Sequence, residues 1–167
     1  MTEEWFDVVD QEDRVIGQAP RSEVHARHLV HRAVHIFLFN GRGEFLLHLR
    51  SAEKDEYPLT YTSSASGHLG VGEEYEKAAE RELQEELGIV ARLQRLVKLP
   101  ASPETAYEHT VLYRAVSDEL PTPNPGEIAE ARFVPWSEVI ELLRTHPEKF
   151  SPPFRLLGEW YDGQFRT

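Results

Sequence analysis

Apolar residues in this chain fall into short runs separated by polar turns, and this pattern predicts strands. Residues 34–39 form an apolar run broken only by His35, which predicts a buried strand. The following Asn-Gly-Arg-Gly stretch at 40–43 is a strong turn signal, and residues 44–48 predict a partner strand. Further strands are expected at 89–97, 110–116 and 131–134.

The N-terminal segment predicts a separate hairpin. Two short apolar runs, 5–9 and 14–18, flank a polar turn, and Pro20 is expected to end the second strand. We expect this hairpin to form an extension over residues 1–30.

Residues 74–87 form the strongest predicted helix. They contain no proline or glycine, are rich in Ala, Glu and Leu, and are followed by Gly88 as a stop signal. Two further helices are expected at about 136–145 and 154–161, and residues 51–66 and 120–126 are expected to be loops. Because strands and helices interleave without a strict alternation, the pattern indicates an α/β fold in which helices sandwich a mixed sheet. The length of 167 residues fits a single domain over 1–167.

Composition narrows the possible partners. The formal net charge is −11, from 18 basic and 29 acidic residues. Such a surface repels nucleic acid polymers and anionic lipid, so neither is an expected partner. It also repels a phosphorylated substrate unless a bound cation reverses the local charge. The chain has no cysteine, which excludes thiolate zinc sites and a cysteine nucleophile. It starts with an acidic segment and contains no apolar stretch of membrane-spanning length, so we expect a cytoplasmic protein.

A group of carboxylates on the predicted helix carries the chemical signal. Glu82, Glu85 and Glu86 are three and four residues apart and therefore share one helical face, while Ala79 and Leu83 lie on a separate apolar stripe. Like charges at this spacing repel each other, which a solvated helix tolerates. The alternative is that divalent cations bind among the oxygens. Hard oxygen ligands without cysteine favour Mg²⁺, with Mn²⁺ as a second choice.

The residues around this helix form a longer motif over 67–89. It resembles the Nudix box at every defining position: Gly67, Glu73, Arg81, Glu82, Leu83, Glu85, Glu86, Gly88 and Ile89. The resemblance implies the loop–helix–loop and the α/β/α sandwich of that family. It also implies attack of a metal-activated water on a phosphorus atom of a small-molecule diphosphate.

Roles for individual residues follow from the same resemblance. Metal ligands are expected to be Glu82, Glu85 and Glu86, with the carbonyl of Gly67 as an addition. Glu73 and Arg81 are expected to brace the loop against the helix, which Gly88 ends. The general base is not fixed by the box, and Glu85, Glu86 and Glu127 are the alternatives.

A second resemblance covers most of the chain. Residues 29–40, 66–68, 124–128 and 150–152 are similar to segments of isopentenyl diphosphate isomerases, a branch of the Nudix fold. His31 and His68 match two of that branch's metal-binding histidines, and either His25 or His28 corresponds to a third. Glu108 falls near the branch's catalytic glutamate, and the resemblance makes His31, His68 and Glu108 candidates for additional metal ligands.

The chain also departs from this branch. Ser66 stands at the catalytic cysteine position, Ala106 at an acidic position, and Pro153 at the position of a tryptophan. A serine hydroxyl is a far weaker acid than a thiol. Because the box is intact, the resemblance favours a divalent-metal-dependent hydrolase that cleaves the phosphoanhydride linkage of a nucleoside diphosphate derivative or a related small molecule. The alternatives are an isopentenyl diphosphate isomerase and a non-catalytic module that senses a nucleotide. The sequence leaves the substrate and the oligomeric state open.

Overall fold

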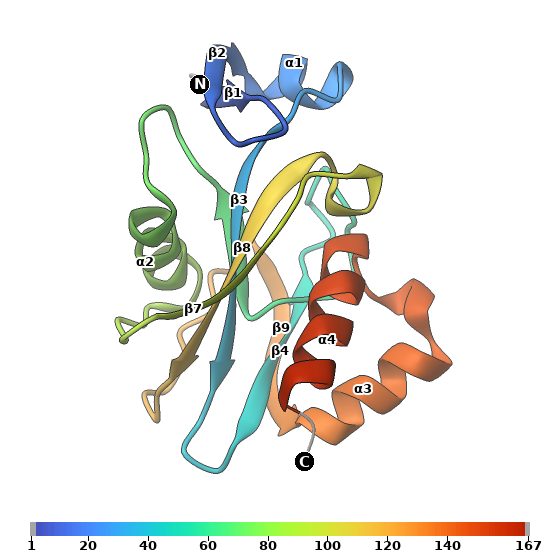
Figure 1. Cartoon of the computed structure of the whole chain (residues 1–167). Helices are drawn as coiled ribbons and strands as arrows, with labels where there is room; N and C mark the ends of the chain where they lie inside the picture. Colours follow the sequence, from blue (N-terminus) through green and yellow to red (C-terminus); the bar gives the residue numbers. More distant parts are fainter. Residues whose placement is uncertain (1–2, 166–167) are drawn as a thin grey trace.

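A mixed sheet forms the centre of the chain, as the computed structural model of residues 3–165 shows (Figure 1). Within these residues the sheet has seven strands, with β5-β4-β3-β8-β7 in order, β6 paired with β3 and β9 paired with β4. The strands are β3 (His31–Phe39), β4 (Glu44–Arg50), β5 (Tyr61–Thr62), β6 (Ala65–His68), β7 (Gln94–Leu99), β8 (Glu108–Val116) and β9 (Ile128–Pro135).

Helices cover both faces of this sheet, so the expected α/β sandwich with a mixed sheet is confirmed. Helix α2 (Tyr75–Leu87) lies on one face, and α3 (Trp136–Thr145) and α4 (Pro152–Phe165) lie on the other (Figure 1). Two apolar cores fill the layers, one under α2 and one under α3 and α4. None of the helices in residues 3–165 is long and apolar enough to cross a membrane.

Helix α2 forms where local signals predict it. Ala79, Leu83 and Leu87 are buried against the sheet, as the apolar stripe predicts. Gly88 ends the helix with a left-handed φ of 67°, and its N–H donates to the carbonyl of Gln84. The apolar face of α2 is thereby fixed on the sheet, and its carboxylates Glu82 and Glu86 lie next to the backbone of β6.

The expected pairing of the first two central strands is largely wrong. β3 and β4 pair only at Phe39 and Phe45, next to their connecting turn, and then diverge. β3 instead pairs in parallel with β8 and antiparallel with β6, while β4 pairs antiparallel with β9. The divergence separates the far end of β3 from Arg50 at the end of β4, and the candidate site lies between them.

Three other expectations about elements need correction. The region 51–66 contains strand β5 and the start of β6, so it is not all loop. The strand expected at 89–97 is displaced to β7, because Ile89 turns into the core directly after the helix cap. The last helix is longer than the expected 154–161 and begins at Pro152.

The predicted N-terminal hairpin is present. β1 (Trp5–Val9) and β2 (Val15–Pro20) form a two-stranded antiparallel sheet, followed by a short helix α1 (Arg21–Ala26) that the pattern did not predict. These elements, which we call the cap, lie over one end of the central sheet (Figure 1). Residues 1, 2, 166 and 167, which belong to the predicted extension and domain, lie outside the described chain.

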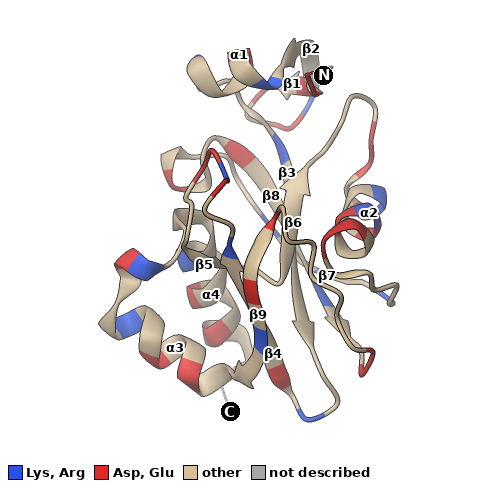
Figure 2. Cartoon of the chain, turned by 180° about the vertical axis from the view of Figure 1, so that it is seen from behind, with Lys and Arg blue, Asp and Glu red and all other residues tan. Residues whose placement is uncertain are grey.

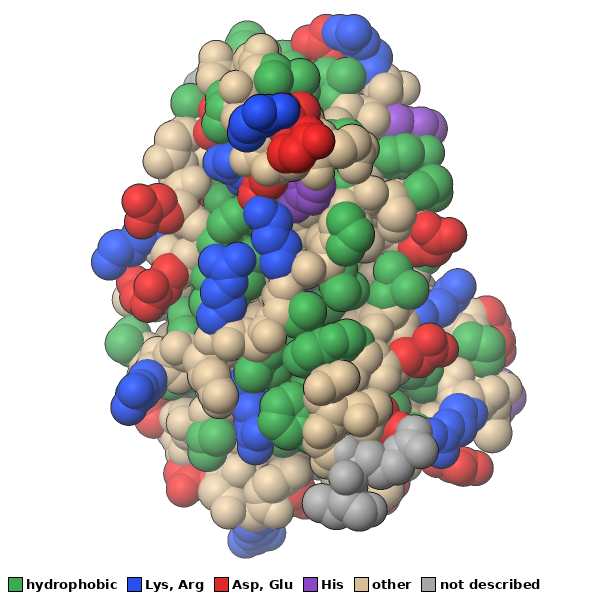
Figure 3. Space-filling view, in the orientation of Figure 1, with side chains coloured by type: hydrophobic (Ala, Val, Ile, Leu, Met, Phe, Trp, Pro, Cys, Tyr) green, Lys and Arg blue, Asp and Glu red, His purple; other side chains and the backbone are tan. Residues whose placement is uncertain are grey.

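Two short 3-10 helices complete the described elements. They are η1 (Pro103–Thr105), which precedes β8, and η2 (Pro147–Lys149), which precedes α4. The surface seen in Figure 3 carries acidic, basic and apolar side chains in a mixture, so the negative net charge does not form one continuous field on this face.

Candidate active site

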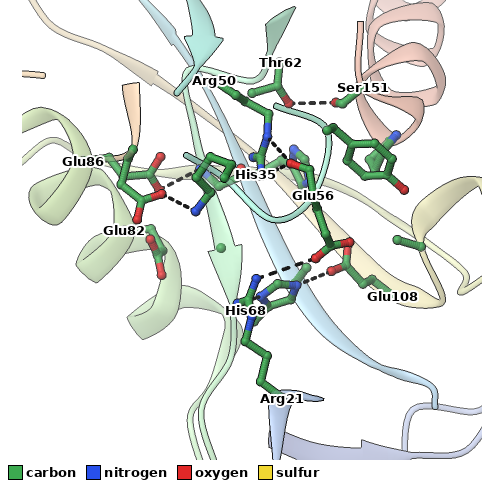
Figure 4. A pocket seen from close by; sticks show the side chains of 18 of the residues that line it. Arg21, His35, Arg50, Glu56, Thr62, His68, Glu82, Glu86, Glu108 and Ser151 are labelled. Atoms are coloured by element: carbon green, nitrogen blue, oxygen red, sulfur yellow. Dashed lines mark hydrogen bonds and ion pairs between the residues drawn. The ribbon is translucent and has the colours of Figure 1, made fainter. Parts of the chain in front are cut away.

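A polar cavity opens where β3 and β4 diverge, and the cap closes one side of it (Figure 4). Its walls come from α1, from the loop 51–60, from α2 and from strands on both sides of β3. Figure 2 shows acidic residues on α2, β8 and β9, around the same end of the sheet. The charged lining residues are Glu4, Arg21, Arg50, Lys54, Glu56, Glu82, Glu86, Glu108 and Glu127.

Three histidines meet at the cap end of the cavity. His25 from α1, His31 from β3 and His68 from β6 each offer a ring nitrogen, and these atoms all lie within 4.8 Å of one another. Glu108 from β8 completes the group, with its Oε2 3.3 Å from His31 Nε2 and 2.5 Å from His68 Nε2. Three imidazoles and a carboxylate are a donor set that suits a divalent transition metal ion such as Mn²⁺.

The Glu108 carboxylate and the His68 ring each stabilise the charged form of the other. Burial would raise the pKa of Glu108, but His68 and His31 outweigh it and hold the pKa well below its usual range. Burial would lower the pKa of His68, and the neighbouring Glu108 carboxylate raises it instead. The carboxylate is therefore ionised, and a positive charge beside it is favoured.

The structure also distinguishes between the two histidines that the sequence left open. His25 lies with the cluster, and burial lowers its pKa, which favours the neutral form that ligates metals. His28 faces away and stacks on the ring of Tyr107, with 4.6 Å between the ring centroids. His25 is therefore the third member of the group.

A second acidic cluster lies on the α2 side of the cavity. Glu86 is buried, and its Oε2 accepts the Ser66 N–H at 3.2 Å. Burial and the adjacent Glu82 carboxylate raise the pKa of Glu86 well above its usual range. Burial likewise raises the pKa of Glu82. Without a cation, at least one of the two carboxylates favours its protonated form. A divalent ion would remove this cost, so the residues fit a metal site.

Gly67 permits the close approach of this cluster to β6. A Cβ atom at position 67 would lie 2.2 Å from the Glu82 Cδ, far inside van der Waals contact. Only glycine therefore lets the β6 backbone approach the Glu82 carboxylate so closely. This geometry places the Gly67 backbone next to the expected metal ligands.

Two other predicted site residues, Glu85 and Glu127, lie at different places relative to the cavity. Glu85 does not line the cavity; its side chain is 57% exposed, and its Oε2 lies 3.2 Å from Arg81 Nη1. Glu127, just before β9, lines the cavity, and its Oε2 lies 2.6 Å from Lys54 Nζ. The structure thus brings Glu82, Glu86 and Glu127 together and leaves Glu85 at the outer side of α2.

Arg81 joins the loop before α2 to the helix. Its guanidinium donates two hydrogen bonds to the Glu73 carboxylate, at 2.8 and 2.9 Å, and one to the His68 carbonyl at 3.1 Å. The Glu73 carboxylate also accepts the Gly70 N–H at 3.0 Å. This fork holds the loop in one shape and fixes the His68 backbone, so that the acidic helix and the histidine cluster keep their relative positions.

Several lining residues had no sequence signal. Arg21, Arg50, Lys54 and Glu56 enter the cavity from α1, from the end of β4 and from the loop 51–60. Each is an ordinary surface residue type in a segment without a motif. Only the tertiary fold identifies them.

Comparisons with known proteins agree with this fold. The family model described as the NUDIX domain matches residues 29–155, so the chain belongs to the NUDIX family. Within the family, it belongs to the subgroup that resembles isopentenyl-diphosphate isomerases. The isopentenyl-diphosphate Delta-isomerase of Nocardia farcinica is 32% identical, over 96% of this chain and 95% of its own. Chloroplastic isomerase I of Arabidopsis thaliana is 34% identical over 93% of this chain, which spans 66% of the plant protein's length.

Solved structures support the same assignment. DR0079 from Deinococcus radiodurans superposes with a TM-score of 0.82 at 26% identity, covering 94% of this chain and 98% of its own. The NUDIX domain of Shewanella oneidensis NrtR, solved with ADP ribose, has a TM-score of 0.63 at 16% identity, covers 87% of this chain and 99% of its own, and shows the shared fold alone.

These findings correct the expected reaction. The sequence favoured a hydrolase of nucleoside diphosphate derivatives because the box is complete. The relatives that match 89% to 96% of this chain are instead named isopentenyl-diphosphate Delta-isomerases, at 29% to 34% identity. The alternative that the sequence ranked second is therefore the better supported one.

Proposed function

We propose that this chain is a metal-dependent isomerase of the isopentenyl diphosphate type, which moves a double bond in a small alkenyl diphosphate. The observation that carries the proposal is the cluster of His25, His31 and His68 against Glu108, in a chain whose relatives bear that name. A plain acidic helix that held a metal for hydrolysis would not require three histidines at the other end of the cavity.

Two cation positions support this function. One is among the three histidines and Glu108, and the other is beside Glu82 and Glu86, where the Gly67 backbone passes close to the Glu82 carboxylate. Mg²⁺ suits the oxygen-rich position, and Mn²⁺ suits either. When bound, the ions neutralise the diphosphate and hold it in place. Arg21 and Lys54 line the same cavity and add positive charge for the phosphate oxygens.

The reaction needs one proton delivered to the terminal alkene carbon and one removed from the carbon on the other side of the cation that forms. The substrate and product therefore have the same composition. Glu108 is ionised and lines the cavity, so its carboxylate is available to accept the proton. Ser66 faces the cavity from β6, on the opposite side of β3 from the Glu108 strand. It stands where the isomerases it resembles have a thiol, so we expect slow turnover.

A single incubation tests this function. The protein is mixed with isopentenyl diphosphate and Mg²⁺ or Mn²⁺, and the mixture is followed by ¹H and ³¹P NMR. We expect the allylic isomer to accumulate with its diphosphate intact, and we expect no reaction after metal removal with EDTA. Release of phosphate as the sole reaction, or an unchanged substrate, contradicts the proposal.

A pair of variants then tests the role of Glu108. Glu108→Gln keeps the shape but removes the ionised oxygen, and we expect it to lower the isomerisation rate by about 10²-fold or more. Glu104→Gln is the control, because Glu104 is exposed on η1 only four residues earlier in the chain. Equal rates for the two variants would exclude Glu108 from proton transfer.

A further inference from the structure

A carboxylate from the loop 51–60 reaches the histidine cluster. Glu56 Oε1 lies 3.3 Å from His25 Nε2 and 3.7 Å from an Arg21 nitrogen, and the side chain is only 27% exposed. Figure 4 shows the Glu56 carboxylate next to the Glu108 carboxylate and the ring of His68. Glu56 lies outside every motif in the sequence, and neither resemblance assigns it a role.

The loop holds Glu56 at this position. The Arg50 guanidinium donates two hydrogen bonds to the Glu56 carbonyl, at 3.0 and 2.8 Å. The next residue, Tyr57, has a left-handed φ of 49°, which a bulky side chain adopts only when its surroundings require it. Its carbonyl accepts the Thr60 hydroxyl at 2.8 Å. The backbone at Glu56 is therefore fixed from both sides.

The histidine nitrogens that face Glu56 and Glu108 indicate that the histidines and the two carboxylates surround one cation. His25 Nε2 and His31 Nε2 are buried, and within the described residues neither makes a hydrogen bond of good geometry. Carboxylate oxygens nevertheless lie 3.3 Å from each of them, Glu56 from the first and Glu108 from the second. Two ligand atoms at right angles around a cation, each about 2.1 Å from it, are about 3 Å apart. The observed spacing matches that of neighbouring ligands.

We propose that Glu56 is a ligand of the cation bound by His25, His31 and His68, with Glu108 on the other side. Two carboxylates and three imidazoles would hold the ion and would leave room beside it for an oxygen of the substrate or of water. The loop 51–60 is then tied to the metal, so that metal binding and closure of this cavity wall are coupled. This assignment rests on the metal site of the proposed function but not on the reaction catalysed there.

A cysteine at position 56 tests the contact directly, because the chain contains no other thiol. Glu56→Cys is titrated with Co²⁺, and a thiolate bound to cobalt gives a charge-transfer band in the near ultraviolet. We expect this band in Glu56→Cys and not in the control Asp55→Cys. Asp55 is the adjacent residue on the same loop, and its carboxylate lies against Arg21 rather than the histidines. Co²⁺ binding by Glu56→Cys without the band overturns the proposal.

A second measurement does not depend on the new thiol. In calorimetric titrations with Mn²⁺, Glu56→Gln is expected to bind at this site about 10–100-fold more weakly than the unaltered chain, and Asp55→Asn with unchanged affinity. Equal affinity for Glu56→Gln and the unaltered chain contradicts the proposal, as does a failure of the unaltered chain to bind. Metal binding that depends on Glu56 without isomerase activity would instead contradict only the proposed reaction.

Discussion

At the scale of single residues, the site contains buried charges that are compatible with folding only when they are compensated. Glu108 has its compensation within the chain, since two imidazoles face it. Glu86 does not, because the charged groups that act on it are two further carboxylates, Glu82 and Glu127. This difference predicts opposite outcomes when each charge is removed from the metal-free protein.

Glu86→Gln is expected to stabilise the metal-free protein at neutral pH. The raised pKa means that folding favours the protonated carboxyl, so stability is lost as the pH rises through that raised pKa. A neutral glutamine avoids this loss, and we expect a Tm in EDTA at pH 7 that is higher by a few degrees. The variant should also lose most of the stabilisation that Mg²⁺ gives at the oxygen-rich position. A lower Tm in EDTA would show that Glu86 is compensated without metal.

Gly67→Ala is expected to abolish activity without unfolding the chain. The added methyl group meets the Glu82 carboxylate at 2.2 Å, so the carboxylate must rotate away from the metal position. Gly70→Ala is the matched control, because its new methyl group would find only Glu73, at 3.9 Å. We expect a rate at least ~10²-fold lower for the first variant and a near-normal rate for the second. Circular dichroism checks that both variants are folded.

Ser66→Cys is expected to raise the isomerisation rate by about tenfold or more. A thiol is a much stronger acid than a hydroxyl and gives up its proton more readily within the cavity. Ser137→Cys, at an exposed position on α3, controls for the presence of a thiol elsewhere. NMR rates measured under identical metal concentrations provide the comparison, and a rate no higher than that of Ser137→Cys would remove Ser66 from the proposed chemistry.

At the scale of elements, the sequence predicts a helix or a turn well when the residues that define it lie within that element. Helix α2 was predicted nearly to the residue, since its apolar stripe and Gly88 stop lie within its own sequence. The turn at 40–43 was also correct. The partner of β3 was not, because hydrophobicity alone cannot show that β8, far along the chain, takes the place beside it. The same long-range pairing places Glu108 opposite His31.

The candidate site was predictable to a similar extent. The motif predicted Glu82, Glu85 and Glu86, of which Glu82 and Glu86 line the cavity. The resemblance pointed to His31, His68 and Glu108, which lie together. Glu56 was not identifiable, because its approach depends on a loop whose shape is set by Arg50 and by left-handed backbone. The reaction was not predictable from the box, because carboxylates that hold a diphosphate through metal ions are useful whichever bond then changes.

The cap is an element whose attachment affects the site. Its turn residue Asp13 is nearly buried and contacts Arg32 Nε at 2.6 Å, the Tyr75 hydroxyl at 2.7 Å and the Lys98 ammonium. Since His25 lies on α1 of the same cap, we expect Asp13 to position His25 for the metal site. Its contacts join the cap to β3, α2 and β7.

Asp13→Ala is therefore expected to weaken metal binding at a distance. Loss of the carboxylate removes the ion pairs to Arg32 and Lys98 and the hydrogen bond from the Tyr75 hydroxyl, and is expected to destabilise the fold by about 2 kcal/mol. The Mn²⁺ affinity of the histidine site should fall with it, while the Glu82 side retains its affinity. Glu12→Ala is the control, since the neighbouring Glu12 is exposed and its carboxylate lies 3.5 Å from the exposed Arg14. Unchanged affinity in Asp13→Ala would show that the cap does not position His25.

At the scale of the whole molecule, buried neutral histidines make the fold sensitive to acid. Burial lowers the pKa of both His35 and His48 to about 4. The unfolded chain binds these protons at about pH 6.5, so the free energy of unfolding falls as the pH decreases from about 6.5 to 4. Each histidine accounts for a loss on the order of 3 kcal/mol over this range. His48→Asn keeps a donor for the Ser64 carbonyl and should show a smaller fall in Tm between pH 7 and 4.5. An identical fall would show that His48 is not a cause.

The measurement that tests the central claim most directly is the fate of solvent hydrogen in the substrate. Isopentenyl diphosphate is incubated with the protein and Mn²⁺ in D₂O, and deuterium in the recovered diphosphate ester is located by NMR. The account predicts carbon-bound deuterium in an intact diphosphate, in wild-type protein and to a greater extent in Ser66→Cys. Recovery of phosphate with no deuterium on carbon would contradict it.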